Sequence, residues 1–179
     1  GVAWYTSEGT KYADVTAKDF VAGFRHMLDC KAGLEYLVDG IIVGATDYYK
    51  NNGSWDDVKF VATDDYTLEI TLEQPTSYFM TMLTYSCFLP ICDSFYQARG
   101  GVYGVEEYKA ASAEDSYTFG KSTDVASQVY CGPFLVQKLE KDSEIYLVRN
   151  KNYYKNTETT IDSIKWVADA GEDLVALYN

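Results

Sequence analysis

The chain has 179 residues, of which 47% are hydrophobic and 23% are charged, proportions typical of a folded globular protein rather than a disordered one. Its formal net charge of −12 argues against nucleic acid as a partner, because phosphate binding needs a surface rich in Lys and Arg. The longest apolar run, at residues 40–45, is far shorter than the roughly 20 residues that cross a membrane as a helix.

The N-terminal part of the chain predicts a short strand over residues 2–6 and then a well-defined helix. Thr16 is typical of a helix N-cap, and Asp19 stands where a carboxylate reaches back to the cap, as in a capping box. The apolar residues that follow recur at helical spacing and predict a helix over residues 17–29. A weaker pattern predicts a second helix over residues 32–50. Its apolar side would contain Leu34, Leu37, Val38, Ile41 and Ile42.

The middle of the chain predicts a β-hairpin followed by short helices. Residues 58–62 and 67–72 have strand patterns, the second with strict alternation, and Asp64-Asp65 between them favours a turn. Pro75 ends the hairpin. The short helices are expected over residues 77–84, 92–98 and 104–112, with an extended break at residues 89–91.

The C-terminal part predicts a polar loop over residues 113–130 and a second hairpin, with strands at 134–139 and 144–148. A further strand is expected over residues 161–167, and a helix begins over 173–178. Because the chain starts in a strand and stops in a helix, we expect it to be part of a longer protein. The residues expected to lie mostly in the core are Phe20, Phe24, Met27, Leu68, Ile70, Leu72, Phe134, Val136, Tyr146 and Val148.

The four cysteines do not predict a metal site. Cys30, Cys87, Cys92 and Cys131 form no CxxC pair, and the chain has a single histidine, so zinc binding is not expected. Cys87 and Cys92 are close enough in sequence to be bridged, and Cys131 could approach either of them. A disulfide therefore remains one possibility. Buried free thiols are the other, and they are the interpretation that we favour.

No catalytic constellation is visible in the sequence. His26 lies inside the first predicted helix, where a half-buried structural role is favoured, and no nucleophile motif accompanies it. The adjacent carboxylate pairs at residues 56–57, 64–65 and 106–107 point in different directions, as turn and helix-end residues do, rather than converging on one bond. The glycine-rich segment at residues 100–104 lacks the lysine of a phosphate-binding loop. We expect no catalytic residue, no cofactor and no metal.

Several segments, in this order, resemble the family of bacterial solute-binding proteins that deliver peptides to ABC importers. The first is V-A-W at residues 2–4 followed by D-V-T-A-K-D-F at residues 14–20, which is similar to the family's tryptophan strand and T-A-x-D-F helix start. The second is the hairpin at residues 60–72 that leads to Pro75 and the aromatic pair at residues 78–79. The third is L-P-I at residues 89–91, similar to the family's proline after a small helix.

The most specific resemblance lies toward the C-terminus. It consists of G-P-F at residues 132–134, V-R-N-K-N-Y-Y at 148–154 and I-D-S-I at 161–164. The patterns G-P-[FY], R-N-x-x-Y-[WY] and I-D-x-I at these spacings are hard to obtain by chance. The chain departs from the family at Cys30, where a proline commonly ends the helix, and at Cys131, just before Gly-Pro.

The resemblance implies a mixed α/β (α+β) fold, the first-lobe portion of a periplasmic-binding-protein type II fold with β-hairpins and several helices. Residues 1–130 would form an accessory subdomain of the first lobe, and residues 131–179 the start of its main sheet. The resemblance covers nearly all of this chain but less than half of a full-length member of the family. The second lobe, and any export signal, are expected outside this chain.

The resemblance also implies the function, that of a substrate-binding component of an ABC importer. Such proteins close two lobes around a peptide outside the cytoplasmic membrane and present it to a permease. For the full-length protein we expect a peptide ligand, permease partners, a monomeric state, and a periplasmic or lipid-anchored surface location. The one ligand contact carried over is Tyr36, shortly after the T-A-x-D-F helix, with a helix-surface or packing tyrosine as the alternative.

Other functions stay open at this point. A member of the same family could bind a nickel complex, an oligosaccharide or an opine instead of a peptide, and this region does not distinguish them. A tyrosine-rich acidic domain could also act on glycans, which would require converging carboxylates. A pure interaction module without a small ligand is the remaining alternative.

Overall fold

The computed structural model describes residues 1–121 and 123–168, which fall into two compact units. We call Val15–Phe119 the helical unit, and Gly1–Asp14 together with the chain from Gly120 onward the sheet unit. The expected division at residue 131 differs from these boundaries, because residues 1–14 and 120–130 group with the C-terminal sheet. The assignment of either unit to a part of the first lobe stays a prediction, and the helix expected over residues 173–178 lies outside the described residues.

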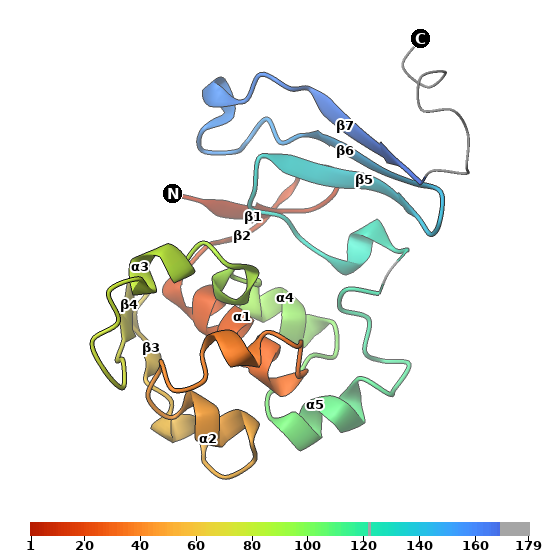
Figure 1. Cartoon of the computed structure of the whole chain (residues 1–179). Helices are drawn as coiled ribbons and strands as arrows, with labels where there is room; N and C mark the ends of the chain where they lie inside the picture. The colour runs from red at the N-terminus through yellow and green to blue at the C-terminus, as the bar shows by residue number, and fades with distance from the viewer. Residues whose placement is uncertain (122, 169–179) are drawn as a thin grey trace. The chain divides into compact units, whose positions relative to one another are not determined.

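Helix α1 (Ala17–Asp29) is the central element of the helical unit, as Figure 1 shows. It has the bounds that the sequence predicts, and Asp19 Oδ2 accepts a hydrogen bond from the Thr16 backbone N–H at 2.8 Å. Asp19 Oδ1 accepts a second bond, from the Asp93 backbone N–H at 2.9 Å. One buried carboxylate therefore caps α1 and also holds the start of a later helix.

Shorter elements surround α1 and contact it. Strands β3 (Phe60–Asp64) and β4 (Thr67–Ile70) form the predicted antiparallel hairpin. Three of the remaining helices lie within the expected ranges 77–84, 92–98 and 104–112. The fourth is a short part of the helix expected over residues 32–50. The four helices are α2 (Ala45–Tyr49), α3 (Phe79–Met82), α4 (Asp93–Ala98) and α5 (Val105–Ala111), with 3-10 turns at Glu35–Leu37, Trp55–Asp57 and Ser86–Phe88.

The core of the helical unit is an aromatic stack on the buried face of α1. Phe24 stacks on Phe60 with ring centroids 4.3 Å apart and an interplanar angle of 14°, and its centroid lies 6.0 Å from that of Phe88. Phe24 and Met27 are buried, as predicted. Phe20 and the inward residues of β4 are only partly buried against this cluster. The stack joins the helix, the hairpin and the segment after α3.

The second long helix, expected over residues 32–50, does not form. Gly40 and Gly44 have positive φ angles of 66° and 79°, which interrupt the helical backbone, and only Ala45–Tyr49 is α-helical. Between the two glycines, the chain pairs with the hairpin: Val43 N donates to Thr71 O at 3.0 Å and Glu73 N to Ile41 O at 2.9 Å. The apolar residues that are spaced as on a helix face lie instead in a 3-10 turn, an extended segment and a short helix.

Gly23 allows another segment to approach α1 closely. A Cβ atom at this position would lie 2.2 Å from the Leu89 carbonyl oxygen. The extended L-P-I segment therefore runs directly against the helix backbone, where Ile91 N donates to Asp19 O at 3.1 Å. The proline of this motif thus belongs to a segment that can approach α1 closely because position 23 has no side chain.

The sheet unit contains two β structures. Strand β1 (Ala3–Tyr5) pairs with β2 (Lys11–Asp14), while β5 (Phe134–Glu140), β6 (Glu144–Arg149) and β7 (Ser163–Val167) form an antiparallel sheet in that order. The second hairpin and the last strand are therefore confirmed. The core prediction is partly wrong: Leu135 is the buried residue of β5, and the four residues predicted in this sheet are half-buried. The β5–β6 register shifts after Val136, so simple alternation does not identify the covered face.

The most specific sequence motifs meet in the sheet unit. Asn150 is fully buried; its backbone N–H donates to Pro133 O at 2.8 Å and its side-chain amide to Gly132 O at 3.1 Å. Arg149 Nη2 lies 2.9 Å from Asp162 Oδ1. The R-N, G-P and I-D motifs are thus one hydrogen-bonded cluster, which explains why these residue types occur together.

Replacing Asp19 should strongly destabilise the helical unit. Asp19→Ala leaves two backbone N–H groups without their acceptor, and we expect the free energy of unfolding to fall by about 3 kcal/mol, from roughly 1–3 kcal/mol per unsatisfied buried group. Urea unfolding followed by circular dichroism measures this. Asp115→Ala, at an exposed position, is the matched control and should change stability by less than about 0.5 kcal/mol. Equal effects of the two changes would contradict the capping role.

Candidate functional site

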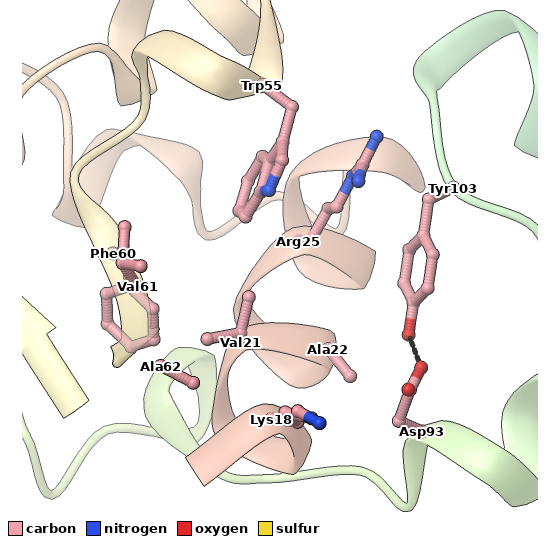
Figure 2. A pocket seen from close by; sticks show the side chains of 10 residues that line it. All are labelled: Lys18, Val21, Ala22, Arg25, Trp55, Phe60, Val61, Ala62, Asp93 and Tyr103. Atoms are coloured by element: carbon pink, nitrogen blue, oxygen red, sulfur yellow. Dashed lines mark hydrogen bonds between the residues drawn. The ribbon is translucent and has the colours of Figure 1, made fainter. Parts of the chain in front are cut away.

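A hollow in the helical unit lies against the exposed side of α1. It has a volume of about 290 Å³ and combines apolar and charged side chains, which Figure 2 shows from close by. Val21 and Ala22 of α1 and Phe60 of β3 form its apolar part, while Lys18 and Arg25 lie two helical turns apart along its length. The other lining residues are Trp55, Val61, Ala62, Asp93 and Tyr103.

Arg25 lies between two aromatic rings at one end of this hollow (Figure 2). Its guanidinium carbon is 4.8 Å from the Trp55 ring centroid and 5.0 Å from the Tyr103 ring centroid. Cation–π contacts of this kind contribute about 0.5–1 kcal/mol each at exposed sites. Because the two rings come from a 3-10 turn and from the segment before α5, the arginine also fixes these segments to α1.

A buried carboxylate lies behind the arginine. Asp29 Oδ1 accepts a short hydrogen bond of 2.5 Å from the Tyr48 hydroxyl, and Oδ2 accepts one from the Gly104 backbone N–H at 2.9 Å. Asp29 Oδ2 is 3.9 Å from Arg25 Nε, outside hydrogen-bond distance. Burial raises the pKa of Asp29 above its usual value, and burial together with the Asp29 contact raises the pKa of Tyr48 to about 12.

The opposite side of the hollow is braced by a second tyrosine–aspartate pair. The Tyr103 hydroxyl donates to Asp93 Oδ1 at 2.6 Å, and the Gln97 side-chain amide donates to the same oxygen at 2.8 Å. Desolvation raises the pKa of Tyr103, so this hydroxyl stays protonated. The ring that covers Arg25 is therefore held by its own hydroxyl group, and the walls of the hollow are fixed.

Tyr36, the sequence-predicted ligand contact, lies elsewhere in the helical unit. It is in the 3-10 turn Glu35–Leu37, its side chain is 69% exposed, and it does not line the hollow beside Arg25. This exposure argues against a packing role, but a surface tyrosine and a ligand contact would both be exposed in this way. Its role in binding stays a prediction.

His26, the single histidine, is packed among aromatic rings. Its ring centroid is 4.9 Å from that of Tyr96, 5.4 Å from Tyr108 and 5.8 Å from Phe119. Burial lowers its pKa to about 4, and Nδ1 has no hydrogen-bond partner among the described residues. Of the surface and half-buried positions that the sequence leaves open for this histidine, the structure shows the half-buried one.

The cysteine thiols of the helical unit are wholly or partly buried. Cys87 and Cys92 are buried thiols and Cys30 is a half-buried thiol, and burial raises the pKa of each, which lowers the fraction of reactive thiolate. Within residues 1–121 and 123–168, no three His, Cys, Asp or Glu side chains come close enough to hold a metal ion. None of the helices described there has the length and hydropathy of a membrane span.

The hollow could not be found from the sequence. Trp55 and Tyr103 are distant from Arg25 along the chain, and neither stands in a recognisable motif. The one available signal is the helical spacing that places Lys18 and Arg25 on one face of α1, outside its apolar side.

Comparison with known proteins identifies relatives along almost the whole chain. The model of the bacterial extracellular solute-binding proteins, family 5, middle region, matches residues 7–177. The oligopeptide-binding protein AmiA of Streptococcus pneumoniae is 35% identical over 178 residues, covering 99% of this chain and 25% of that protein. SarA of Streptococcus gordonii, also an oligopeptide-binding protein, is 33% identical over 95% of this chain and 23% of its own length. The chain therefore spans about a quarter of the curated relatives that it matches.

Solved structures show the same fold. The substrate-binding domain of an oligopeptide ABC transporter from Bacillus anthracis matches with a TM-score of 0.70 and 27% identity, covering 94% of this chain and 28% of that one. Listeria monocytogenes OppA bound to peptide matches with a TM-score of 0.72 and 23% identity, over 94% and 29% of the two chains. These matches confirm the expected periplasmic-binding-protein fold class.

The burial of His26 predicts a stability that depends on pH. Its pKa of about 4 in the folded state lies below the unfolded value near 6.5, so its contribution is complete above pH 6.5 and is lost as pH falls toward 4. The full loss would be about 3 kcal/mol, at 1.36 kcal/mol per pKa unit. Unfolding measured between pH 4 and 7 should show a smaller acid-induced loss in His26→Phe than in the original chain. Tyr108→Phe, the control, should keep the original pH dependence; identical profiles for all three proteins would contradict the prediction.

Proposed function

The chain belongs to family 5 of the bacterial extracellular solute-binding proteins, and we propose that the complete protein captures peptides outside the cytoplasmic membrane and delivers them to an ABC importer. The observation that supports this most directly is the match to AmiA, an oligopeptide-binding protein, along 99% of this chain. The helical and sheet units would then be parts of the first lobe. Peptide capture requires a second lobe that closes on the ligand, as in other two-lobe binding proteins.

A peptide is the solute that the comparisons favour. AmiA, SarA and AliA are each named as oligopeptide-binding proteins and are 30% or more identical to this chain. YgiS of Escherichia coli, named as a probable deoxycholate-binding protein, is 25% identical over 92% of the chain. Similar proteins are thus named for other solutes as well. This chain is more identical to the peptide-binding proteins, and for that reason we prefer a peptide over a nickel complex, an oligosaccharide or an opine.

The proposal also covers location, partners and the absence of catalysis. A peptide importer's binding protein works on the outer side of the cytoplasmic membrane, in the periplasm or held there by a lipid anchor, and its partners are the permease subunits. A single two-lobe molecule can do this, so we propose a monomer. The relatives are named as binding proteins, which supports a transport role rather than that of an enzyme or a glycan-acting domain.

Tyr36 is the residue of this chain that we propose as a ligand contact. In the full-length protein, Tyr36→Phe removes one hydroxyl and should weaken peptide binding by about 1 kcal/mol, the scale of a single hydrogen bond. Calorimetry with a peptide panel measures the change. Tyr66→Phe, at another exposed tyrosine on the β3–β4 turn, is the matched control and should bind as the original protein does. Equal affinity of both variants and the original protein would remove Tyr36 from the site.

The 179-residue chain by itself should bind peptide weakly or not at all. Affinity in a two-lobe protein depends on burial of the ligand between the lobes, and this chain would supply only part of the first one. Calorimetry on the full-length protein and on residues 1–179, with the same peptides, compares the two directly. Micromolar or tighter binding of the same peptides by the short chain would show that the main site lies within it.

A further inference from the structure

We propose that the hollow beside Arg25 is a second binding site, which takes a carboxylate group attached to a short apolar body. This site would lie entirely within the helical unit, so it does not depend on closure of two lobes or on peptide capture between them. The inference rests on the charge, the free hydrogen-bond donors and the apolar lining of the hollow.

The hollow is locally positive in an acidic protein. Lys18 and Arg25 lie on one face of α1, two turns apart, and Asp93 is the single acidic residue of the lining. The chain as a whole has a net charge of −12. The lining therefore carries two cations and one carboxylate, although Arg25 also borders a neighbouring hollow lined by Asp56, Glu106 and Glu107. An excess of cations favours binding of an anionic group. Asp93 Oδ1 already accepts hydrogen bonds from Tyr103 and Gln97, which reduces its competition for the cations.

Arg25 has donors available for this anion. The guanidinium carbon lies 4.8 Å and 5.0 Å from the Trp55 and Tyr103 ring centroids, and within the described part of the chain its terminal nitrogens make no hydrogen bond. Among the described residues, its side-chain hydrogen bond is the long contact from Nε to the Tyr48 hydroxyl oxygen, at 3.4 Å. A carboxylate can therefore bind the terminal nitrogens in the bidentate geometry that suits both groups.

The neighbouring carboxylate of Asp29 makes only a long ion-pair contact with Arg25. Both oxygens of Asp29 are engaged, by the Tyr48 hydroxyl and by the Gly104 N–H, and Oδ2 is 3.9 Å from Arg25 Nε. Arg25 is thus held in position by the two rings rather than by a tight ion pair. A cation that is fixed before the ligand arrives loses little conformational entropy on binding.

The rest of the hollow accommodates an apolar body of limited size. Its volume of about 290 Å³ exceeds the roughly 150 Å³ of a cavity that holds benzene. Val21, Val61 and Ala62 are the apolar lining residues with accessible side chains, and they offer no hydrogen bonds, so they favour hydrocarbon over a polar group, as in other small-molecule sites. A phenyl or branched aliphatic group separated from a carboxylate by one or two carbon atoms matches this combination.

Two sources could supply the same chemistry, namely a free small carboxylate or the C-terminal residue of a peptide. The test uses 3-phenylpropionate for the first and N-acetyl-Gly-Phe for the second, each added to the ¹⁵N-labelled 179-residue chain. The readout is the indole N–H signal of Trp55, assigned by its loss in Trp55→Phe. We expect saturable chemical-shift changes at Trp55 and at backbone amides of α1 with at least one of the two acids. The acid that binds more tightly identifies whether the natural ligand is a free carboxylate or a peptide C-terminus.

Matched ligands and variants separate a carboxylate site from nonspecific apolar binding. The amides of both probes, which have the same shape without the charge, should bind at least tenfold more weakly. Lys18→Glu should give a similar loss and still fold, because an acidic residue is favourable in the first turn of a helix. Arg25→Gln should also lose binding, with thermal unfolding as the check on its fold. Lys109→Gln, an exposed lysine on α5, is the control and should bind normally.

Three results would overturn the site. The first is acids and amides that bind equally, and the second is a Lys18→Glu variant that binds like the original chain. The third is the absence of shifts at Trp55 with both acids. Because the full-length protein's peptide affinity is measured separately, failure here would leave the proposed transport function unaffected.

Discussion

The stacking of Phe24 on Phe60 is the contact on which the helical unit depends. It joins the buried face of α1 to the β3–β4 hairpin, and Phe88 extends the same aromatic cluster to the segment after α3. With its buried face fixed in this way, α1 presents Lys18 and Arg25 on its other side. Phe60 belongs both to this stack and to the lining of the hollow beside Arg25, so the core contact also fixes one wall of the hollow.

The parts of the fold that the sequence predicts well are those governed by local rules. Helix α1 has a capping residue and regular apolar spacing, and its bounds are those predicted. The second hairpin agrees to within one residue at each strand end, whereas both strands of the first differ from the prediction by two residues at one or both ends. Residues 32–50 have apolar spacing as well, but Gly40 and Gly44 adopt positive φ angles and the intervening segment pairs with a hairpin that comes later in the chain. Such long-range pairing overrides a local pattern and cannot be identified from that pattern alone.

The family was accessible from the sequence because its motifs form one physical cluster. Gly132, Asn150 and Asp162 belong to segments whose backbones and side chains are bonded together, so the residue types recur with their spacing. The hollow beside Arg25 has no such signature. Its walls are single aromatic residues from separate loops, and only the folded chain brings their rings to either side of the guanidinium group.

The close approach at Gly23 limits how this protein can be engineered or can diverge. Replacing a helical glycine with alanine commonly raises stability, since alanine has the higher helix propensity by about 1 kcal/mol. Gly23→Ala would not stabilise this helix, because the added methyl group would collide with the Leu89 carbonyl. The central helix must therefore keep one of its weakest helix formers at mid-length, and any change there requires a compensating shift of the segment around Pro90. Position 23 and that segment would vary only as a pair.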